Sequence, residues 1–369
     1  ETLDGRVQLP HWSEWVNGII GLPVRNIWAG ARPSVARIKT LMNLTRAGRF
    51  VAATAAGLFL VGGTVAAHAT VGAPVDGQMT LQAPVTPIAE FAQWFYSYVT
   101  YIIIAITLFV LGLMGYVIVR FNEKANPEPS KFTHNTTVEV LWTVIPIFIL
   151  IAIGIPSFRL LFQQYEYPKP DVVIKSVGNA WYWDHVYPDE DELTVTQYMV
   201  TDEDLLKANI GDERYDEAYG ELEGLELHRA TFRDAAQYWA KYPAQRQLAT
   251  DNPIAVPVNK NVHVLVTSND VIHGWAIPAF ASRTQAVPGR TTATWFRATK
   301  KGAFYGQCAV LCGTRHAFMP IEIHVVDEPV YQQWLGLVKD DKYDEAKKLL
   351  YDSLPEGSKQ VAMQNKTNN

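Results

Sequence analysis

The sequence predicts an α+β membrane protein, in which a hairpin of two transmembrane helices carries a separate β-rich domain. Two long apolar stretches, followed by short strand-like segments, lead to this prediction. The stretches are residues 94–119 and 140–158, and neither contains a charged residue. A bilayer core of about 30 Å requires about 20 helical residues, and an open strand could not satisfy its backbone in lipid. We therefore predict helices over 94–119 and 140–163, within a hairpin of residues 70–165.

The charges around these stretches predict which side of the membrane the rest of the chain occupies. Arg120, Lys124 and Lys131 lie in the connection between the stretches, whereas residues 70–93 contain neither lysine nor arginine. Short loops rich in lysine and arginine stay on the cytoplasmic side. The connection is therefore expected there, or on the equivalent side of an organelle, and the β-rich domain is expected on the outer face.

A third apolar stretch precedes the hairpin. Residues 50–69 follow Arg46 and Arg49 and end in Ala-His-Ala. A basic flank, an apolar segment and small terminal residues are typical of a signal peptide. We therefore interpret 48–69 as a signal-like segment, with a third transmembrane helix as the alternative. The preceding residues, 1–47, form an N-terminal extension to which the sequence assigns no role.

The residues after the hairpin have the pattern of a β-rich domain, which we assign to 171–327. Short segments rich in Val, Ile, Thr, Tyr and Trp alternate with turn residues, as in a β-sandwich or barrel. The clearest strand-like segments are residues 172–177, 180–186, 261–266, 291–297 and 321–326.

Two helix-favouring segments accompany this domain. The first, residues 202–248, is an insertion whose first 25 residues contain ten Asp or Glu against Lys207 and Arg214. Such a high density of charge is typical of a solvent-exposed face. We therefore interpret the insertion as a solvent-exposed surface segment rather than a binding module. The second, residues 328–369, is expected to form one amphipathic helix over 328–350 and a polar tail.

Overall charge and cysteine content narrow the classes of function. The formal net charge is −5, and acidic residues gather between 184 and 226. Nucleic-acid binding requires a basic stripe, so the sequence argues against it and favours a basic protein partner. The chain contains only two cysteines, Cys308 and Cys312, which excludes a disulfide framework.

Residue types that bind soft metals gather near the end of the β-rich domain. Cys308, Cys312, His316 and Met319 lie within twelve residues, and His273 lies in a separate loop. Thiolate, thioether and imidazole together favour copper over hard cations. Zinc would accept two Cys and two His, and a disulfide between the cysteines is a second alternative in an oxidising compartment. A mononuclear blue-copper centre uses one Cys, so two thiolates suit a bridged pair of copper ions better.

These residues belong to a longer segment that resembles a known family. Residues 267–326, which include Ala-Val-Pro-Gly-Arg at 286–290, resemble the dinuclear copper (CuA) segment of cytochrome c oxidase subunit II. The resemblance extends through Trp-Tyr-Trp at 181–183 and through both apolar stretches. It implies that the exported domain is a cupredoxin-like Greek-key β-sandwich or barrel. It also implies the copper ligands, which are the bridging thiolates of Cys308 and Cys312, the imidazoles of His273 and His316, the thioether of Met319 and the backbone carbonyl of Val310.

The same resemblance implies a function. A subunit II of this family accepts electrons from cytochrome c and passes them to the haem centres of subunit I, in a complex that also contains subunit III. There dioxygen is reduced to water, coupled to proton translocation. Trp181 matches the surface aromatic residue where electrons enter, and Glu139 matches a carboxylate at the entrance of a proton path; one of Trp181 and Trp183 is expected to be a packing residue. The acidic residues expected to steer the basic cytochrome by long-range attraction are Asp189, Asp191, Glu192 and Asp270.

The match fails at position 310, where Val310 replaces a glutamate that helps to bind magnesium at the interface with subunit I. The backbone carbonyl can still bind copper, because every residue has one. The valine side chain offers no oxygen, so we expect a weakened or absent magnesium site, or one completed by partner-subunit ligands and water. Asn179, Val186 and Gln285 also depart from the family pattern, which puts hydrogen bonds at the subunit interface in question.

Three other assignments share parts of this pattern. A quinol-oxidase subunit II has the same fold without the copper ligands, and nitrous oxide reductase shares the cysteine motif but carries a large propeller domain. A membrane-anchored copper-binding protein would not need Trp181 or Glu139. We expect the bacterial inner membrane, with the copper domain on the periplasmic side. The alternative is the mitochondrial inner membrane, with the domain in the intermembrane space.

Overall fold

The fold is described by a computed structural model. The described residues are 72–75, 77–128 and 130–355. The N-terminal extension 1–47, the signal-like segment 48–69 and the end of the polar tail, 356–369, lie outside them.

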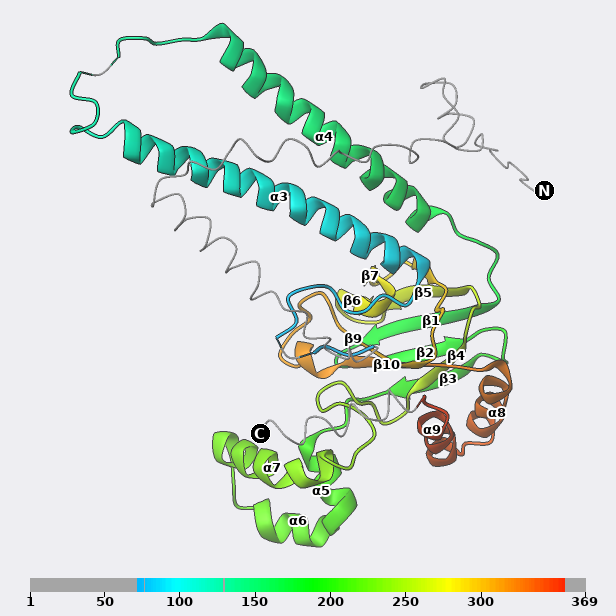
Figure 1. Ribbon diagram of the computed structural model, residues 1–369. Helices are drawn as coiled ribbons and strands as arrows, with labels where there is room; N and C mark the ends of the chain where they lie inside the picture. Colours follow the sequence, from blue (N-terminus) through cyan, green and yellow to red (C-terminus); the bar gives the residue numbers. More distant parts are fainter. Residues whose placement is uncertain (1–71, 76, 129, 356–369) are drawn as a thin grey trace. The chain divides into compact units, whose positions relative to one another are not determined.

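Two long apolar helices precede the β-rich domain (Figure 1). They are α3 (Pro87–Arg120) and α4 (Thr136–Tyr165), and each is long and apolar enough to cross a membrane. Most of their large apolar side chains are exposed, as expected of a surface that faces lipid and unlike the core helix of a soluble protein. The hydroxyl group of Tyr98 in α3 donates a hydrogen bond to the carbonyl of Ala152 in α4 at 3.2 Å, which joins the two helices.

Both helices begin earlier than the apolar stretches predicted. The side chain of Thr86 caps α3 by accepting a hydrogen bond from the amide of Ala89 at 3.0 Å, and Pro87 occupies the first turn. Asn135 caps α4 in the same way through the amide of Val138, at 3.2 Å. Such caps satisfy backbone N–H groups that a helix start leaves unpaired. Polar residues next to the apolar stretches therefore extend each helix.

The β-rich domain is built from sheets of mixed direction. The largest has the strand order β3-β2-β1-β5-β8, a second has the order β4-β10-β9, and β6 pairs with β7. β1 is parallel to β5 and β4 is parallel to β10, whereas the other pairs are antiparallel. The strands are β1 (Val172–Asn179), β2 (Tyr182–Tyr187), β3 (Leu193–Gln197), β4 (Ile254–Pro257), β5 (Val262–Ser268), β6 (His273–Ile277), β7 (Ser282–Ala286), β8 (Thr292–Phe296), β9 (Gly302–Gln307) and β10 (Pro320–Val326), with short 3₁₀ turns η2 (Pro278–Phe280) and η3 (His316–Phe318).

Side chains from all of these sheets meet in one hydrophobic core. β5 alternates buried and half-buried residues along its length, as a strand with one face in the core must. The largest fully buried side chains include Trp183 in β2, Trp275 in β6 and Phe304 in β9. Cys308 and Cys312 belong to the same buried cluster, so a close-packed interior surrounds the candidate metal ligands.

The acidic insertion folds as a packed helical unit. Its helices are α5 (Asp202–Ile210), α6 (Asp212–Tyr219) and α7 (Gly224–Trp239). Leu206, Tyr215 and Trp239 lie in a second buried cluster. At its base Asp202 accepts hydrogen bonds from the indole of Trp239 at 2.8 Å and from the guanidinium of Arg246 at 2.6 Å. The insertion is therefore a packed helical unit and not an irregular loop, and it shares its buried cluster with Tyr305 of β9 and with Tyr351.

The C-terminal region contains two helices where the sequence predicted one over 328–350. They are α8 (Glu328–Lys339) and α9 (Tyr343–Asp352), and Asp341 between them has a positive φ of 58°. A right-handed helix cannot continue through a residue in the left-handed region. The break lets both helices bury an apolar face, with Trp334 of α8 and Leu350 of α9 almost fully enclosed.

Candidate metal centre

The candidate ligands come from the connection between β9 and β10 and from the start of β6. Cys308 and Cys312 follow β9, His316 lies in η3, and Met319 directly precedes β10. β9 and β10 are antiparallel, so the connection leaves and re-enters the sheet at the same end. β6 lies against β9, and His273 is its first residue. The topology thus brings a residue distant in sequence to the cysteine loop.

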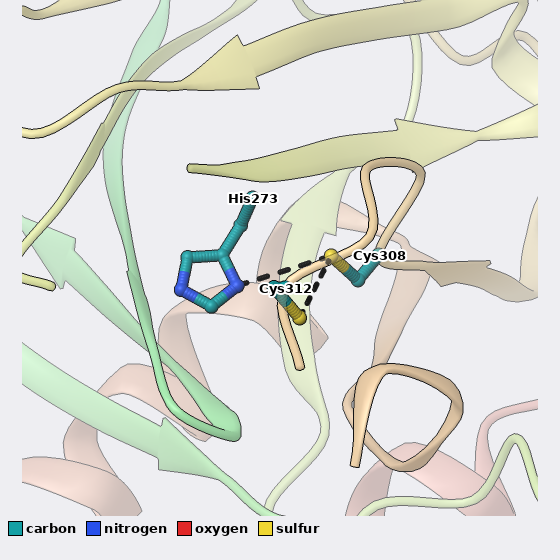
Figure 2. Close-up of side chains that lie close together, drawn as sticks. All are labelled: His273, Cys308 and Cys312. Atoms are coloured by element: carbon teal, nitrogen blue, oxygen red, sulfur yellow. Dashed lines mark hydrogen bonds between the residues drawn. The ribbon is translucent and has the colours of Figure 1, made fainter. Parts of the chain in front are cut away.

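Figure 2 shows the imidazole of His273 and the thiol groups of Cys308 and Cys312 pointing toward one another. The Cys308 Sγ and Cys312 Sγ atoms are 3.8 Å apart, and the Nδ1 atom of His273 is 3.9 Å from Cys308 Sγ. All three donor atoms lie within 4.8 Å of one another.

The remaining candidate ligands border the same pair of sulfurs. His316 Nδ1 and Met319 Sδ each lie 3.6 Å from Cys312 Sγ. The carbonyl oxygen of Val310 lies 3.2 Å from Cys308 Sγ. The structure therefore brings together all six donors named from the sequence, with an imidazole beside each thiol.

These separations fit metal coordination. With bonds of about 2.3 Å to sulfur and about 2.0 Å to nitrogen, two donors in a tetrahedral shell lie about 3.5–3.8 Å apart. The observed distances fall in or close to this range, and both cysteines are free thiols. The thioether of Met319 is almost fully buried and directed at a thiol, and soft donors of this kind favour copper.

The scaffold separates the acidities of the two thiols. Burial opposes ionisation of Cys308, but its contacts with His273 Nδ1 and with the amide of Gly274 outweigh this effect and lower its pKa. Burial and the charge on Cys308 raise the pKa of Cys312. The thiolate is the metal-binding form of cysteine, so Cys308 is the thiol prepared to ionise first.

Two glycines allow other groups to approach the ligands closely. A Cβ atom on Gly178 in β1 would lie 2.8 Å from the Cδ2 atom of His273. Gly313, directly after Cys312, has a φ of 123°, and a Cβ there would lie 3.0 Å from the indole of Trp181. Glycine tolerates the close approach of these side chains and the positive φ because it has no Cβ.

The two tryptophans that flank Tyr182 differ in burial. Trp183 is fully buried, and its indole N–H donates to the carbonyl of Met319 at 3.2 Å. Trp181 is only partly buried, and its indole N–H donates to the carbonyl of Cys312 at 3.2 Å. Trp181 is therefore the indole that both reaches the surface and contacts the ligand loop.

Most of the acidic residues predicted to steer a partner lie away from this site. Asp189, Asp191 and Glu192 occupy the turn after β2, whereas Trp181 directly precedes that strand. β2 has six residues, and at about 3.3 Å per residue it separates the two groups by about 20 Å. Lys339 also lies 3.7 Å from the carboxylate of Asp191. Only Asp270 adjoins the candidate ligands, through a contact of 2.8 Å with His273.

Glu139 lies in the first turn of α4, where its carboxylate contacts the amide of Asn135 at 3.4 Å. Twenty-six residues of the same helix separate it from Tyr165 at the other end, which corresponds to about 40 Å at about 1.5 Å per residue. The structure therefore places Glu139 near the connection between the helices and not beside the candidate ligands.

Two further contacts were not predicted from the sequence. The guanidinium of Arg283 in β7 donates to the carbonyl of Ala309 at 3.1 Å, which fixes the middle of the cysteine loop. The amide of Gly274 lies 3.5 Å from Cys308 Sγ. The glycine directly after His273 is a signal for such a close backbone approach, whereas nothing in the sequence pairs Arg283 with Ala309.

Comparisons with known proteins agree with this geometry. The family model described as "Cytochrome C oxidase subunit II, periplasmic domain" matches residues 172–218 and 233–326, and its "transmembrane domain" counterpart matches 74–160. The cytochrome c oxidase subunit 2 of Cereibacter sphaeroides is 42% identical over 274 residues, which are 74% of this chain and 84% of the relative. The chain belongs to the cytochrome c oxidase subunit II family.

Other similar proteins carry the same description. A probable cytochrome c oxidase subunit 2 of Rickettsia felis is 41% identical over 71% of this chain and 72% of the relative. A crystal structure of the periplasmic domain of subunit II from Bradyrhizobium japonicum is 35% identical and covers 48% of this chain and 99% of that one, with a TM-score of 0.36.

Membership of the subunit II family establishes several coarse properties. The chain is a membrane protein with an α+β architecture, in which two apolar helices join a cupredoxin-like periplasmic domain. It is a subunit of an oxidoreductase complex, and its His273, Cys308 and Cys312 cluster is consistent with a copper centre. The periplasmic-domain model skips residues 219–232, so much of α7 is an addition to the family domain.

Proposed function

We propose that this subunit II accepts single electrons from cytochrome c at a dinuclear CuA centre and passes them to the haem centres of subunit I. The convergence of two thiols, two imidazoles, a thioether and a carbonyl on one buried pair of sulfurs supports this proposal. A copper-free quinol-oxidase subunit would have no use for these six donors.

The residues of the chain would hold two copper ions as follows. The thiolates of Cys308 and Cys312, the imidazoles of His273 and His316, the thioether of Met319 and the backbone carbonyl of Val310 would hold the two ions. A thiolate-bridged copper pair supplies one-electron oxidation and reduction when it is bound. Cys308, Cys312 and Met319 lie in a close-packed interior, and the amide of Gly274 contacts Cys308 Sγ, so these ligands need to move little between the two redox states.

Trp181 would be the entry point for electrons. Its indole is partly exposed and is one hydrogen bond of 3.2 Å away from the backbone of Cys312. A donor that packs on this indole would come close to the copper ligands without entering the protein. We place Asp270 in the same contact because it adjoins His273, whereas Asp189, Asp191 and Glu192, at the other end of β2, would attract the basic cytochrome over a longer range.

The proposal extends to the rest of the complex. Subunit I would receive the electrons and reduce dioxygen to water with proton translocation, beside subunit III. Glu139, at the start of α4, would face a proton path. The basic residues between α3 and α4 support an orientation with the copper domain on the outer face of the membrane. We place the chain in the bacterial inner membrane with this domain in the periplasm, and the mitochondrial inner membrane is the alternative.

Copper content and spectroscopy test the copper assignment. In its purified complex the full-length chain should itself hold two copper ions, counted apart from any copper of subunit I, show a purple colour and give a seven-line EPR pattern. Met319→Leu should alter the spectrum by removing a soft ligand, whereas Met199→Leu, outside the site, should leave it unchanged. One copper ion, a zinc ion or a colourless metal-free protein would refute the assignment. Slow reduction by cytochrome c with an intact purple centre would indicate a copper-binding protein instead.

Magnesium binding is a separate part of the proposal. Val310 presents an apolar side chain where the family glutamate offers an oxygen ligand, so we expect weak or absent magnesium at the subunit I interface. Manganese titration followed by EPR should show less than stoichiometric binding, and Val310→Glu should increase it. A stoichiometric manganese signal of high affinity in the unaltered complex would contradict this expectation.

A further inference from the structure

Asp270 uses both of its carboxylate oxygens inside the protein. Its Oδ1 atom lies 2.8 Å from the Nε2 atom of His273, and its Oδ2 atom accepts a hydrogen bond from the amide of Ala180 at 2.6 Å. The Oδ1 atom also accepts the amide proton of Val271 at 2.6 Å. The side chain is about a third exposed (35%). An acid that served only to attract a distant partner would need no hydrogen bonds within the protein, whereas both oxygens of Asp270 accept them.

The contact with His273 decides which nitrogen can bind a metal. An ionised carboxylate can only accept hydrogen bonds, so Nε2 must carry a proton. The other nitrogen, Nδ1, is then free to donate its lone pair, and it is the atom that faces Cys308 Sγ at 3.9 Å. Carboxylates that fix the tautomer and the orientation of a metal-binding imidazole are a recurrent feature of metal sites. The imidazole of His273 is fully buried, so Asp270 is its link toward the surface.

The contact with Ala180 reaches the turn that carries Trp181. Ala180 and Trp181 connect β1 to β2, and Asn269, the residue before Asp270, binds the adjoining end of β1. The side-chain amide of Asn269 donates to Asn179 Oδ1 at 2.9 Å, and its backbone amide donates to the carbonyl of Gly178 at 3.1 Å. Asn269 and Asp270 therefore bind three consecutive residues, 178–180, at the end of β1 and the start of the turn.

We propose that Asp270 is a positioning residue, which holds the copper ligand His273 and the entry residue Trp181 in one fixed arrangement. This inference rests on the proposed function and adds to it a role that partner attraction does not supply. The carboxylate ties the ligand and the entry turn together from opposite sides. Asn179, which departs from the family pattern, takes part in the same arrangement through Asn269.

The inference predicts effects that appear without any partner protein. Asp270→Ala in the full-length complex removes the hydrogen bonds to His273 and to Ala180. It should weaken copper binding by about 10- to 100-fold, as for other carboxylates behind metal-binding histidines. It should also shift the EPR pattern and the copper reduction potential, at low and at high salt alike. Asp270→Asn removes the charge but keeps one carbonyl oxygen for His273, so its copper affinity should lie closer to that of the wild type than that of Asp270→Ala.

A matched control distinguishes the effect of the Asp270 hydrogen bonds from the effect of losing one negative charge. Asp344→Asn, an exposed acid in α9 outside the site, makes the same charge change and should leave the copper spectrum, potential and affinity unaltered. If Asp270→Ala also leaves all three unaltered and only slows reduction by cytochrome c at low salt, Asp270 is a docking residue alone and the inference is overturned. A wild-type chain that binds no copper pair would instead refute the proposed function, so the two failures are distinguishable.

Discussion

Gly178→Ala tests whether the scaffold holds His273 in one place. Gly178 lies in β1, and a Cβ atom there would lie 2.8 Å from Cδ2 and 3.0 Å from Cγ of His273. Ordinary carbon contacts are about 3.5–4.0 Å, so either the imidazole or the strand must shift. The imidazole cannot rotate away freely, because Asp270 contacts its Nε2 atom at 2.8 Å.

The expected cost follows from two opposing effects. Inserting a methyl group into a filled interior costs about 1–3 kcal/mol. Replacing a strand glycine by alanine gains about 0.5–1 kcal/mol because the unfolded chain loses freedom. The cost of overpacking therefore outweighs the gain, and the substitution should lower the free energy of unfolding. Each kcal/mol lost corresponds to a decrease of about 2–4 °C in Tm for a domain of 150–250 residues.

Thermal unfolding of the full-length protein, with and without copper, measures this effect. Gly178→Ala should lower the Tm in both forms and change the copper EPR pattern. Gly336→Ala in α8, where a Cβ would meet nothing within 4 Å, is the matched control and should leave the Tm unchanged or raise it slightly. A Gly178→Ala protein with wild-type Tm and wild-type copper spectrum would refute the reasoning, because the imidazole of His273 could then move away from the added methyl group without cost.

Three further predictions concern electron entry, pH and the core. Trp181→Phe removes the indole bond to Cys312 and should slow bimolecular reduction by cytochrome c at least tenfold in stopped-flow measurements, with an unchanged copper spectrum; an unchanged rate would exclude Trp181 as the entry point. Burial lowers the pKa of His185 from 6.5 to about 4, so the unfolded chain binds the proton first. The free energy of unfolding should therefore fall as the pH is lowered from 6.5 to about 4, by up to about 1.4 kcal/mol per pH unit. Denaturant titrations of His185→Gln should show a smaller dependence on pH in this range. Tyr351→Phe removes a hydroxyl that donates to the buried carboxylate of Glu322 at 2.8 Å, and it should lower the free energy of unfolding by about 1–3 kcal/mol; a loss below that range would mean that other donors already satisfy Glu322.

Local patterns in the sequence were enough to predict much of the fold. Uncharged stretches long enough for a bilayer marked α3 and α4, because lipid imposes a length and an internally bonded backbone on any segment that crosses it. Runs of β-branched and aromatic residues marked β1, β2, β5, β8 and β10. The strands that the sequence missed, such as β7 (Ser282–Ala286) and β9 (Gly302–Gln307), are short or rich in glycine. They become strands through their neighbours in the sheets and have little propensity of their own.

For the candidate metal centre, too, the sequence predicted one part and the tertiary structure decided the other. The donor types and their order in the chain were visible in the sequence, because soft metals demand sulfur and imidazole and a short loop keeps most of these donors together. Only the tertiary structure brought the distant His273 to the cysteines, left Trp181 at the surface while it buried Trp183, and turned Asp270 inward toward the imidazole. These outcomes depend on which strands pair and on which side chains the core has room for, and contacts between distant segments leave no periodic signal in the sequence.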